Sequence, residues 1–361
     1  MYIRSLAVSD CRIISNAEIV PSPGFNLICG ENGSGKSSLL EAIYLLGTGR
    51  SFRSPSPSSL VKYGKNILTV FAEIESPSGQ LFSVGMERGK NNNRLHINRS
   101  PTIRLSEAAE ILPLQIITPD SINLVIGAPR SRRSFLDWGM FHVEPDFLNV
   151  VKRYKKTVRQ RNALLKRERR AGSELSYWNE LLADDGEKIT AYRRDYLDEI
   201  VEIYQEKIST LMESLSGLDI TFSYRKGWSG SGDLLGAIEG SMEKDIATGR
   251  TTHGPHEADF IISSNKGKAK DVLSRGQAKL LSIELYLSQL YHLHEKMGKR
   301  AVILLDDIFS ELDRNNGFLI LNYLVSGGYQ VFATTTDPGL KLPDIGNVEM
   351  FHVEHGDIIH Q

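Results

Sequence analysis

The residues that most clearly carry chemistry lie at positions 30–37. They read Gly-Glu-Asn-Gly-Ser-Gly-Lys-Ser and match the phosphate-loop pattern G-x-x-x-x-G-K-[ST] at every fixed position. Glycines let such a loop curl so that its N–H groups converge on phosphates at a helix N-terminus. Lys36 would bring its charge to the β- and γ-phosphates, and the Ser37 hydroxyl would bind Mg²⁺. The sequence thus predicts an ATP- and Mg²⁺-binding site at Gly30, Glu31, Asn32, Gly33, Ser34, Gly35, Lys36, Ser37 and Ser38.

A phosphate loop of this kind needs an acidic partner at the end of a buried strand. Residues 301–307 read Ala-Val-Ile-Leu-Leu-Asp-Asp, an apolar run typical of a strand in a parallel sheet. We expect Asp306 to help hold Mg²⁺, as a Walker B residue, and Asp307 to polarise the attacking water. Adjacent aspartates can also mark a helix start. The phosphate loop in the same chain favours the catalytic interpretation, with Lys36, Asp306 and Asp307 as its residues.

A third motif indicates the subclass of ATPase. Residues 273–277 read Leu-Ser-Arg-Gly-Gln and open an amphipathic helix expected to run to about Glu295. The motif resembles the LSGGQ signature of ABC-type ATPases, in which the signature binds the γ-phosphate held by the other protomer. The resemblance implies a role in trans for Ser274, Arg275, Gly276 and Gln277. Ser310 and Asp313 match the D-loop of that family, which crosses its dimer interface.

Four further segments extend the resemblance over nearly the whole chain. Residues 6–12, 51–53, 127–137 and 252–256 are similar to those of the RecF family of bacterial recombination ATPases, in the SMC-like branch of ABC-type proteins. This resemblance implies an ATP-dependent homodimer that binds double-stranded DNA near gap junctions and works with RecO and RecR. It also implies loading of RecA in DNA repair, replication-fork recovery and the SOS response. Its ATPase would be weak, stimulated by DNA and switch-like.

Two other classes of protein share these motifs. One is the nucleotide-binding subunit of an ABC transporter, and the other is a scaffold that binds ATP without useful hydrolysis. The long, basic insert between the phosphate loop and the signature argues against a transporter subunit. Intact Lys36, Asp306 and Ser274 indicate that the chain is competent for hydrolysis.

Some positions depart from the ABC pattern. Asp307 stands where transport ATPases usually have Glu, and a carboxylate held farther back should slow hydrolysis. Thr336 is the candidate for the place of the switch histidine. The Q-loop residue is either Gln115 or Asp120. Glu257 follows the Gly-Pro-His motif where a basic residue is commoner, which makes a phosphate-binding role for that position doubtful.

These motifs require an α/β frame to position them. The first hundred residues read as strands and turns around one helix at 38–46, whereas 130–205 suits long helices. Strands are expected at 301–305 and 329–334, with a helix at 315–324 between them. We therefore predict an ABC-type P-loop ATPase head with a β-rich N-terminal part and an inserted helical lobe. The head would comprise 1–110 and 245–361 and the lobe 111–244, with the signature near their junction and no long coiled coil, because sustained heptads are absent.

DNA contact requires local basic clustering, because the net charge is only −1. The densest run follows residue 150, and helical spacing places several of its cations on a common face. The candidates for DNA contact are Lys152, Lys155, Lys156, Arg159, Arg161, Lys166 and Arg170. A solvated face balanced by nearby acids is the alternative. Arg130, Arg132 and Arg133 could serve DNA, the partner's nucleotide or lobe-to-lobe salt bridges.

Composition limits the remaining possibilities. The 361 residues are 40% apolar and 24% charged, as in globular proteins. Cys11 and Cys29 lie in apolar segments and are expected as buried free thiols. We expect a cytoplasmic protein, because no apolar run approaches the length of a membrane span or signal peptide. The tryptophans are expected to be packing residues, and 349–359 is expected to form a hairpin that turns at His355 and Gly356.

Overall fold

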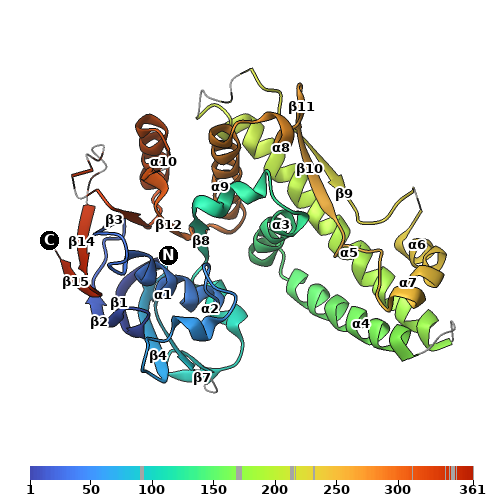
Figure 1. Cartoon of the computed structure of the whole chain (residues 1–361), viewed down its shortest axis with the longest axis horizontal. Coiled ribbons are helices and arrows are strands. Elements are labelled where there is room, and N and C mark those ends of the chain that lie inside the picture. The colour runs from blue at the N-terminus through green and yellow to red at the C-terminus, as the bar shows by residue number, and fades with distance from the viewer. Residues whose placement is uncertain are drawn as a thin grey trace. The chain divides into compact units, whose positions relative to one another are not determined.

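The computed structural model describes residues 1–89, 93–167, 173–211, 215, 217–230, 232–310, 312–337, 339–340, 342, 346 and 348–360. The chain divides into two compact units. Unit one comprises residues 1–121 and 298–361, and unit two comprises residues 122–297. Figure 1 traces the elements of both.

A mixed six-stranded sheet positions the phosphate loop in unit one. Its strand order is β15-β14-β3-β13-β12-β8. Neighbouring strands from β14 to β8 pair in parallel, and β15 is antiparallel to β14. The strands are β3 (Phe25–Cys29), β8 (Leu114–Ile117), β12 (Val302–Leu305), β13 (Val331–Thr335), β14 (Val348–Glu354) and β15 (Asp357–His360). Every residue of β3, β12 and β13 is buried, which explains their continuous apolar runs.

A second, antiparallel sheet forms the β-rich N-terminal part of unit one. Its order is β2-β1-β4-β5-β6-β7, and β4 alternates exposed and buried residues as a strand with one solvent face should. The strands are β1 (Tyr2–Cys11), β2 (Ile14–Ile19), β4 (Ile67–Glu75), β5 (Leu81–Gly89), β6 (Asn93–Ile97) and β7 (Ser100–Thr102). Helix α1 (Lys36–Thr48) shares one hydrophobic core with residues of both sheets. The remaining helical segments of unit one include η1 (Pro57–Leu60), α2 (Leu105–Ile111), η5 (Ile308–Ser310) and α10 (Arg314–Ser326), and η2 (Pro119–Leu124) spans the boundary.

Unit two combines long helices with a small sheet. Its helical elements are α3 (Pro129–Val143), α4 (Phe147–Arg167), α5 (Ser173–Ile203), the π-helical turn η3 (Tyr204–Ile208), α6 (Leu234–Gly240), α7 (Met242–Thr248), α8 (Ala269–Val272) and α9 (Arg275–Met297). The antiparallel sheet has the order β11-β10-β9, formed by β9 (Thr221–Arg225), β10 (Asp259–Ser264) and β11 (Gly267–Lys268). Strand β9 packs beside α5, as Figure 1 shows.

The unit boundaries differ from those expected at 110/111 and 244/245. Strand β8 pairs with β12, so the chain leaves unit one later than expected. Segment 245–297 was expected in the head but belongs to unit two. The reason is hydrophobic: Phe260 and Leu281 share a buried cluster with Phe135 and Tyr196. Unit two is therefore not purely helical.

Most of the expected elements are present. The helix expected at 38–46 is α1, the strands expected at 301–305 and 329–334 correspond to β12 and β13, and the C-terminal hairpin is β14–β15. Cys11 and Cys29 are both buried and free, as predicted.

Candidate nucleotide-binding site and signature helix

The phosphate loop joins β3 to α1 at an edge where backbone conformation is tightly constrained. Gly30, Gly33 and Gly35 have φ of 155°, 80° and 121°. A Cβ atom on Gly30 would lie 2.3 Å from the carbonyl oxygen of Val353, so this position has no room for a side chain. Gly35 precedes α1 and supplies no side-chain cap, which leaves the helix N-terminus suited to an anion.

Lys36 lies within this loop and is 8% exposed. Its Nζ donates hydrogen bonds to the carbonyl oxygens of Gly30 and Glu31, each at 2.8 Å. Burial lowers the pKa of Lys36, whereas the negative charges of Asp307 and Asp306 act in the opposite direction. The ammonium group is thus held at the loop that is expected to hold the phosphates. The buried hydroxyl of Ser34 has no hydrogen-bond partner among the described residues, and so can serve a phosphate oxygen.

The Walker B acids meet the phosphate loop at the end of β12. Ser37 Oγ donates to Asp306 Oδ1 at 2.9 Å, so the two expected Mg²⁺-binding groups are adjacent. Thr334 Oγ1 also donates to Asp306 Oδ1, at 3.0 Å, and accepts from the Asp307 N–H at 2.8 Å. The oxygens of Ser37 and Asp306 are of the kind that a hard divalent cation prefers. Sequence reasoning missed Thr334, because its role depends on the parallel pairing of β12 with β13.

The C-terminal hairpin braces the phosphate loop, which the sequence did not predict. The N–H of Gly356 donates to the Ser34 carbonyl oxygen at 2.8 Å. A cavity of about 450 Å³ lies beside the loop, and its lining includes residues 30–34, Thr336, His352, Val353, Glu354 and His355. Thr336 therefore lines a cavity that adjoins the loop, and its place as the switch residue stays a prediction. The sequence predicted the hairpin but not its place beside the loop, because β14 pairs with β3 across more than 300 residues of sequence.

Two segments singled out in the sequence meet behind the loop at the buried Glu41. Arg12 donates to its carboxylate through Nε at 2.9 Å and through Nη2 at 3.0 Å, and Ser51 Oγ donates to it as well. Hydrogen bonding to Glu41 raises the pKa of Arg12. The conformation of the chain on both sides of α1 is thus tied to the helix that carries Lys36.

The signature motif forms the N-terminal cap of α9 in unit two. Ser274 Oγ accepts from the Gln277 N–H at 3.2 Å, and Gln277 Oε1 accepts from the Ser274 N–H at 3.1 Å. This reciprocal pair is a capping box. Because Ser274 Oγ accepts in the cap, its hydrogen stays available for donation. Ser274, Arg275 and Gly276 are exposed, as binding in trans would require.

The remaining candidates near the site have mixed outcomes. Asp313 caps α10 by accepting from the Asn316 N–H at 3.0 Å, which is a structural role that its D-loop assignment did not include. The side chain of Ser310 lies outside the described residues. Gln115 is buried on β8, whereas Asp120 is exposed in η2, and both stay candidates for the Q-loop residue.

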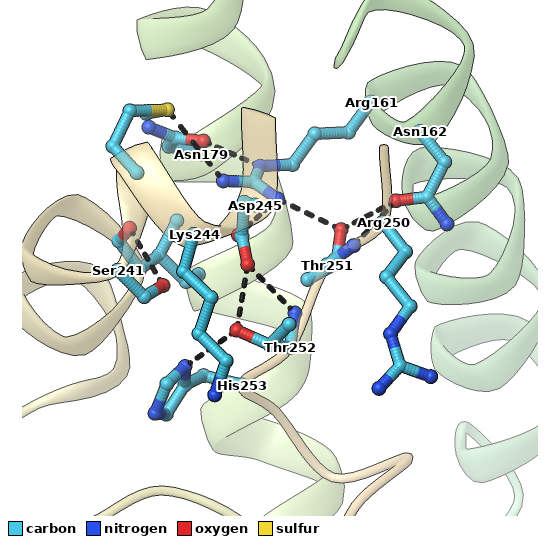
Figure 2. Close-up of polar contacts among 12 residues, drawn as sticks. Arg161, Asn162, Asn179, Ser241, Lys244, Asp245, Arg250, Thr251, Thr252 and His253 are labelled. Atoms are coloured by element: carbon cyan, nitrogen blue, oxygen red, sulfur yellow. Dashed lines mark hydrogen bonds and ion pairs between the residues drawn. The ribbon is translucent and has the colours of Figure 1, made fainter. Parts of the chain in front are cut away.

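Most of the residues expected to contact DNA are exposed on helix α4, and one is buried. Lys152, Lys155, Lys156, Arg159 and Lys166 are exposed, whereas Arg170 lies outside the described residues. Arg161 is wrong as a DNA contact: it is fully buried and pairs with Asp245 at 2.7 Å (Figure 2). The reason is spacing, because the buried face of α4 repeats at Val150, Tyr154, Thr157, Arg161 and Leu165.

The arginines of α3 support unit two internally. Arg132 donates to both carboxylate oxygens of Asp259, at 2.6 and 3.1 Å. Arg133 donates to the Ala258 carbonyl oxygen at 2.7 Å. These bonds lie within unit two and do not join the two units, as the expected lobe-to-lobe salt bridges would. Arg130 is exposed.

Comparison with known proteins gives consistent relatives along the full chain. The family model of the RecF/RecN/SMC N terminal domain matches residues 2–356. The DNA replication and repair protein RecF of Shewanella baltica is 37% identical over 361 residues, and that of Shewanella oneidensis is 38% identical over 364 residues. Both matches cover 99% of this chain and 99% of the relative.

Solved structures agree with this relationship. The structure of the recombination mediator protein RecF with ATP in the RecFOR pathway superposes with a TM-score of 0.89 at 28% identity, covering 100% of this chain and 97% of that one. An SMC head bound to the C-terminal winged-helix domain of ScpA gives a TM-score of 0.58 at 16% identity, which shows the fold alone.

The parallel sheet, the phosphate loop, the Walker B acids and the capped signature helix define an ABC-type P-loop ATPase head. The chain belongs to the RecF family of DNA replication and repair proteins, within the RecF/RecN/SMC group. It is not the nucleotide-binding subunit of an ABC transporter, the alternative that the motifs left open. Within the described ranges, no helix combines the length and apolar character that crossing a membrane requires.

Proposed function

We propose that this chain is an ATP-switched DNA clamp that acts in recombinational repair. Two protomers bind ATP and Mg²⁺ at residues 30–38 and close when the signature of each meets the γ-phosphate held by the other. The observation that carries the proposal is the hydrogen bond between Ser37 and Asp306, at 2.9 Å, beside a phosphate loop. The same chain also exposes the signature serine, Ser274, which caps the N-terminus of α9.

The residues of the site divide the work of hydrolysis between them. Lys36 and the loop N–H groups bind the phosphates, and Ser37 with Asp306 would hold Mg²⁺, which neutralises charge that develops on the transferred phosphoryl group. Asp307 orients the attacking water. Its side chain is one methylene shorter than Glu, so the water is held less closely and turnover is slow, as suits a timed switch.

DNA is the second ligand of the proposed switch. The exposed cations of α4 neutralise backbone phosphates and give affinity without sequence preference. The relatives' names and the RecFOR pathway favour a role with RecO and RecR at gap junctions, where RecA is loaded. DNA binding would favour the closed dimer and so stimulate the weak ATPase.

Light scattering on three forms of the chain tests the switch. The unaltered chain should have the molar mass of a dimer with ATP and Mg²⁺ and that of a monomer without them. Lys36→Met should fail to bind nucleotide and to dimerise. Ser274→Arg should bind a fluorescent ATP analogue normally but stay monomeric, because its own phosphate loop is intact. Dimers of Ser274→Arg at wild-type strength would contradict the role of the signature in trans.

A further inference from the structure

A basic cavity of about 600 Å³ opens on unit two, outside the nucleotide-binding site. Its lining includes Arg225, Lys226 and Lys244, together with His253 and the acids Glu257 and Asp259. The residues come from the end of β9 and the chain just after it, from α7, from the segment that follows α7 and from the start of β10. Neither the nucleotide-binding motifs nor the basic face of α4 gives this cavity a function.

A buried polar network fixes two sides of this cavity. Arg161 Nη1 donates to Asp245 Oδ2 at 2.7 Å and to Thr251 Oγ1 at 2.8 Å. Asp245 Oδ1 accepts from the Thr252 N–H at 3.0 Å and from its hydroxyl at 2.6 Å (Figure 2). The network therefore ties α7 to the segment 251–253. It holds the chain at Lys244 and His253, which directly adjoin two of its members.

A third side of the cavity is fixed by a pinned lysine. Lys226 Nζ donates to the Gly232 carbonyl oxygen at 2.8 Å and lies 4.9 Å from the centroid of the Trp228 ring. Trp228 is itself buried and donates to the same carbonyl oxygen. This lysine is therefore held in place before any ligand arrives, which reduces the entropy cost of binding.

The charges around the cavity leave a positive excess. Asp259 is compensated, because both of its carboxylate oxygens accept hydrogen bonds from Arg132. Glu257 is exposed; burial lowers the pKa of Arg133, and the charge of Glu257 acts on this arginine in the opposite direction. Three permanent cations, Arg225, Lys226 and Lys244, therefore face one carboxylate that lacks such a pair. The cavity suits an anion with several acceptor oxygens.

We propose that this cavity binds a phosphate of the DNA backbone, which extends the DNA-contacting surface from α4 across α7 to β9. A Cβ atom on Gly249, at the end of α7, would lie 3.1 Å from Lys166 Cγ, so the basic face of α4 adjoins α7. Exposed Arg250 follows Gly249. A row of cations this long matches a polyanion better than a single small anion. The inference rests on the proposed DNA-clamp function.

Fluorescence anisotropy with a short labelled DNA duplex, in the presence of ATP and Mg²⁺, tests the cavity. Arg225→Glu and Lys244→Glu should each weaken binding about tenfold and lower the slope of log affinity against log salt by about 1. Lys266→Glu is the matched control, since Lys266 is exposed in the turn after β10, at the opposite end of the β9–β10 ladder from Arg225. The control should leave both values unchanged, and all variants should bind ATP normally.

The outcomes separate the cavity from the function on which it rests. If the unaltered chain binds the duplex and both cavity variants keep its affinity and salt slope, the cavity assignment is overturned and the clamp stands. If the unaltered chain does not bind the duplex, both are overturned. A parallel titration with inorganic pyrophosphate at matched ionic strength distinguishes a site for free anions. Variants that lose pyrophosphate binding but keep duplex binding would overturn the proposal.

Discussion

At the scale of single residues, Thr334 links the two Walker B acids. Its hydroxyl donates to Asp306 and accepts from the backbone of Asp307, so one side chain sets the position of both. Asp307 has a φ of 53°, in the left-handed region that Asp tolerates better than most residues. This conformation redirects the chain at the end of β12, where the second carboxylate is expected to orient water.

The role of Asp307 predicts the behaviour of two substitutions. Asp307→Asn removes the charge that polarises water, so ATP turnover should fall by about 10²-fold while ATP binding persists. The ATP-bound dimer should then outlast that of the unaltered chain in light scattering. Asp307→Glu is the matched control, and its turnover should match or exceed that of the unaltered chain, because the longer side chain holds the water more closely. Unchanged turnover in the Asn variant would exclude Asp307 as the water-orienting group.

The buried ion pair between Arg161 and Asp245 predicts a large loss of stability. Both side chains are fully buried, so Asp245→Ala would leave an uncompensated guanidinium and should destabilise unit two by about 3–5 kcal/mol. Urea unfolding followed by tryptophan fluorescence measures this, because all three tryptophans lie in unit two.

The matched control for this pair lies on the same helix. Arg159 is exposed, and Arg159→Ala should change the free energy of unfolding by only about 0.5 kcal/mol or less. Removing both partners with apolar residues should cost less than Asp245→Ala alone, because no charge is then left unpaired. Equal losses for Asp245→Ala and Arg159→Ala would refute the buried pair.

At the scale of elements, α9 combines an exposed, capped N-terminus with a buried body. Glu284 lies in that body, is fully buried, and neither of its carboxylate oxygens has a hydrogen-bond partner among the described residues. Burial raises the pKa of Glu284 to about 8. The pKa of Tyr204 in η3 is raised mainly by burial and, to a smaller extent, by the negative charge of Glu284. The helix that begins with the signature therefore contains a carboxyl group that is protonated at neutral pH.

The raised pKa of Glu284 predicts that unit two loses stability as pH rises. The unfolded chain releases this proton near the ordinary value of 4.5, whereas the folded chain keeps it to about pH 8. Between these values the folded state binds more protons, so the free energy of unfolding falls with pH, by at most about 1.4 kcal/mol per unit.

Urea midpoints measured at about pH 6.5 and at about pH 8 by tryptophan fluorescence test this dependence. Glu284→Gln should abolish the fall, whereas Glu295→Gln, on an exposed position of α9, should retain it. His292 on the same helix has a pKa lowered by burial, so its contribution rises with pH below its ordinary value of 6.5. That pH range lies below the interval from about pH 6.5 to about pH 8 over which the urea midpoints are compared. A fall that persists in Glu284→Gln would assign the dependence to another group.

Local sequence patterns predicted the helices and strands better than they predicted which of these elements pack or pair with one another. Strand β12 and helix α1 follow from apolar runs and from the phosphate loop, and even the burial of Arg161 is recoverable from the spacing of its helix face. Two features were not predictable in this way. The support of the phosphate loop by Gly356 depends on pairing between distant strands. The place of β10 and α9 in unit two depends on which apolar side chains share a core, and a local pattern does not contain that information.

At the scale of the whole molecule, the two halves of the ATPase chemistry lie in different units. The phosphate loop and Walker B acids belong to unit one, whereas the signature caps a helix of unit two. If the signature acts in trans, a complete catalytic site needs unit one of one protomer and unit two of its partner. A symmetric dimer then contains two such composite sites.

This arrangement predicts complementation between two inactive variants. Lys36→Met and Ser274→Arg should each lack ATPase activity alone. In a mixed dimer, one composite site combines the intact Lys36 of one protomer with the intact Ser274 of the other, and the second site carries both defects. Neither variant is expected to pair with itself, so the dimers of an equal mixture are mixed and each has one good site of two. The mixture should therefore regain at most about half of wild-type turnover. Steady-state phosphate release measures this, with each variant alone as the control. A mixture as inactive as its components would place the signature on the nucleotide of its own chain.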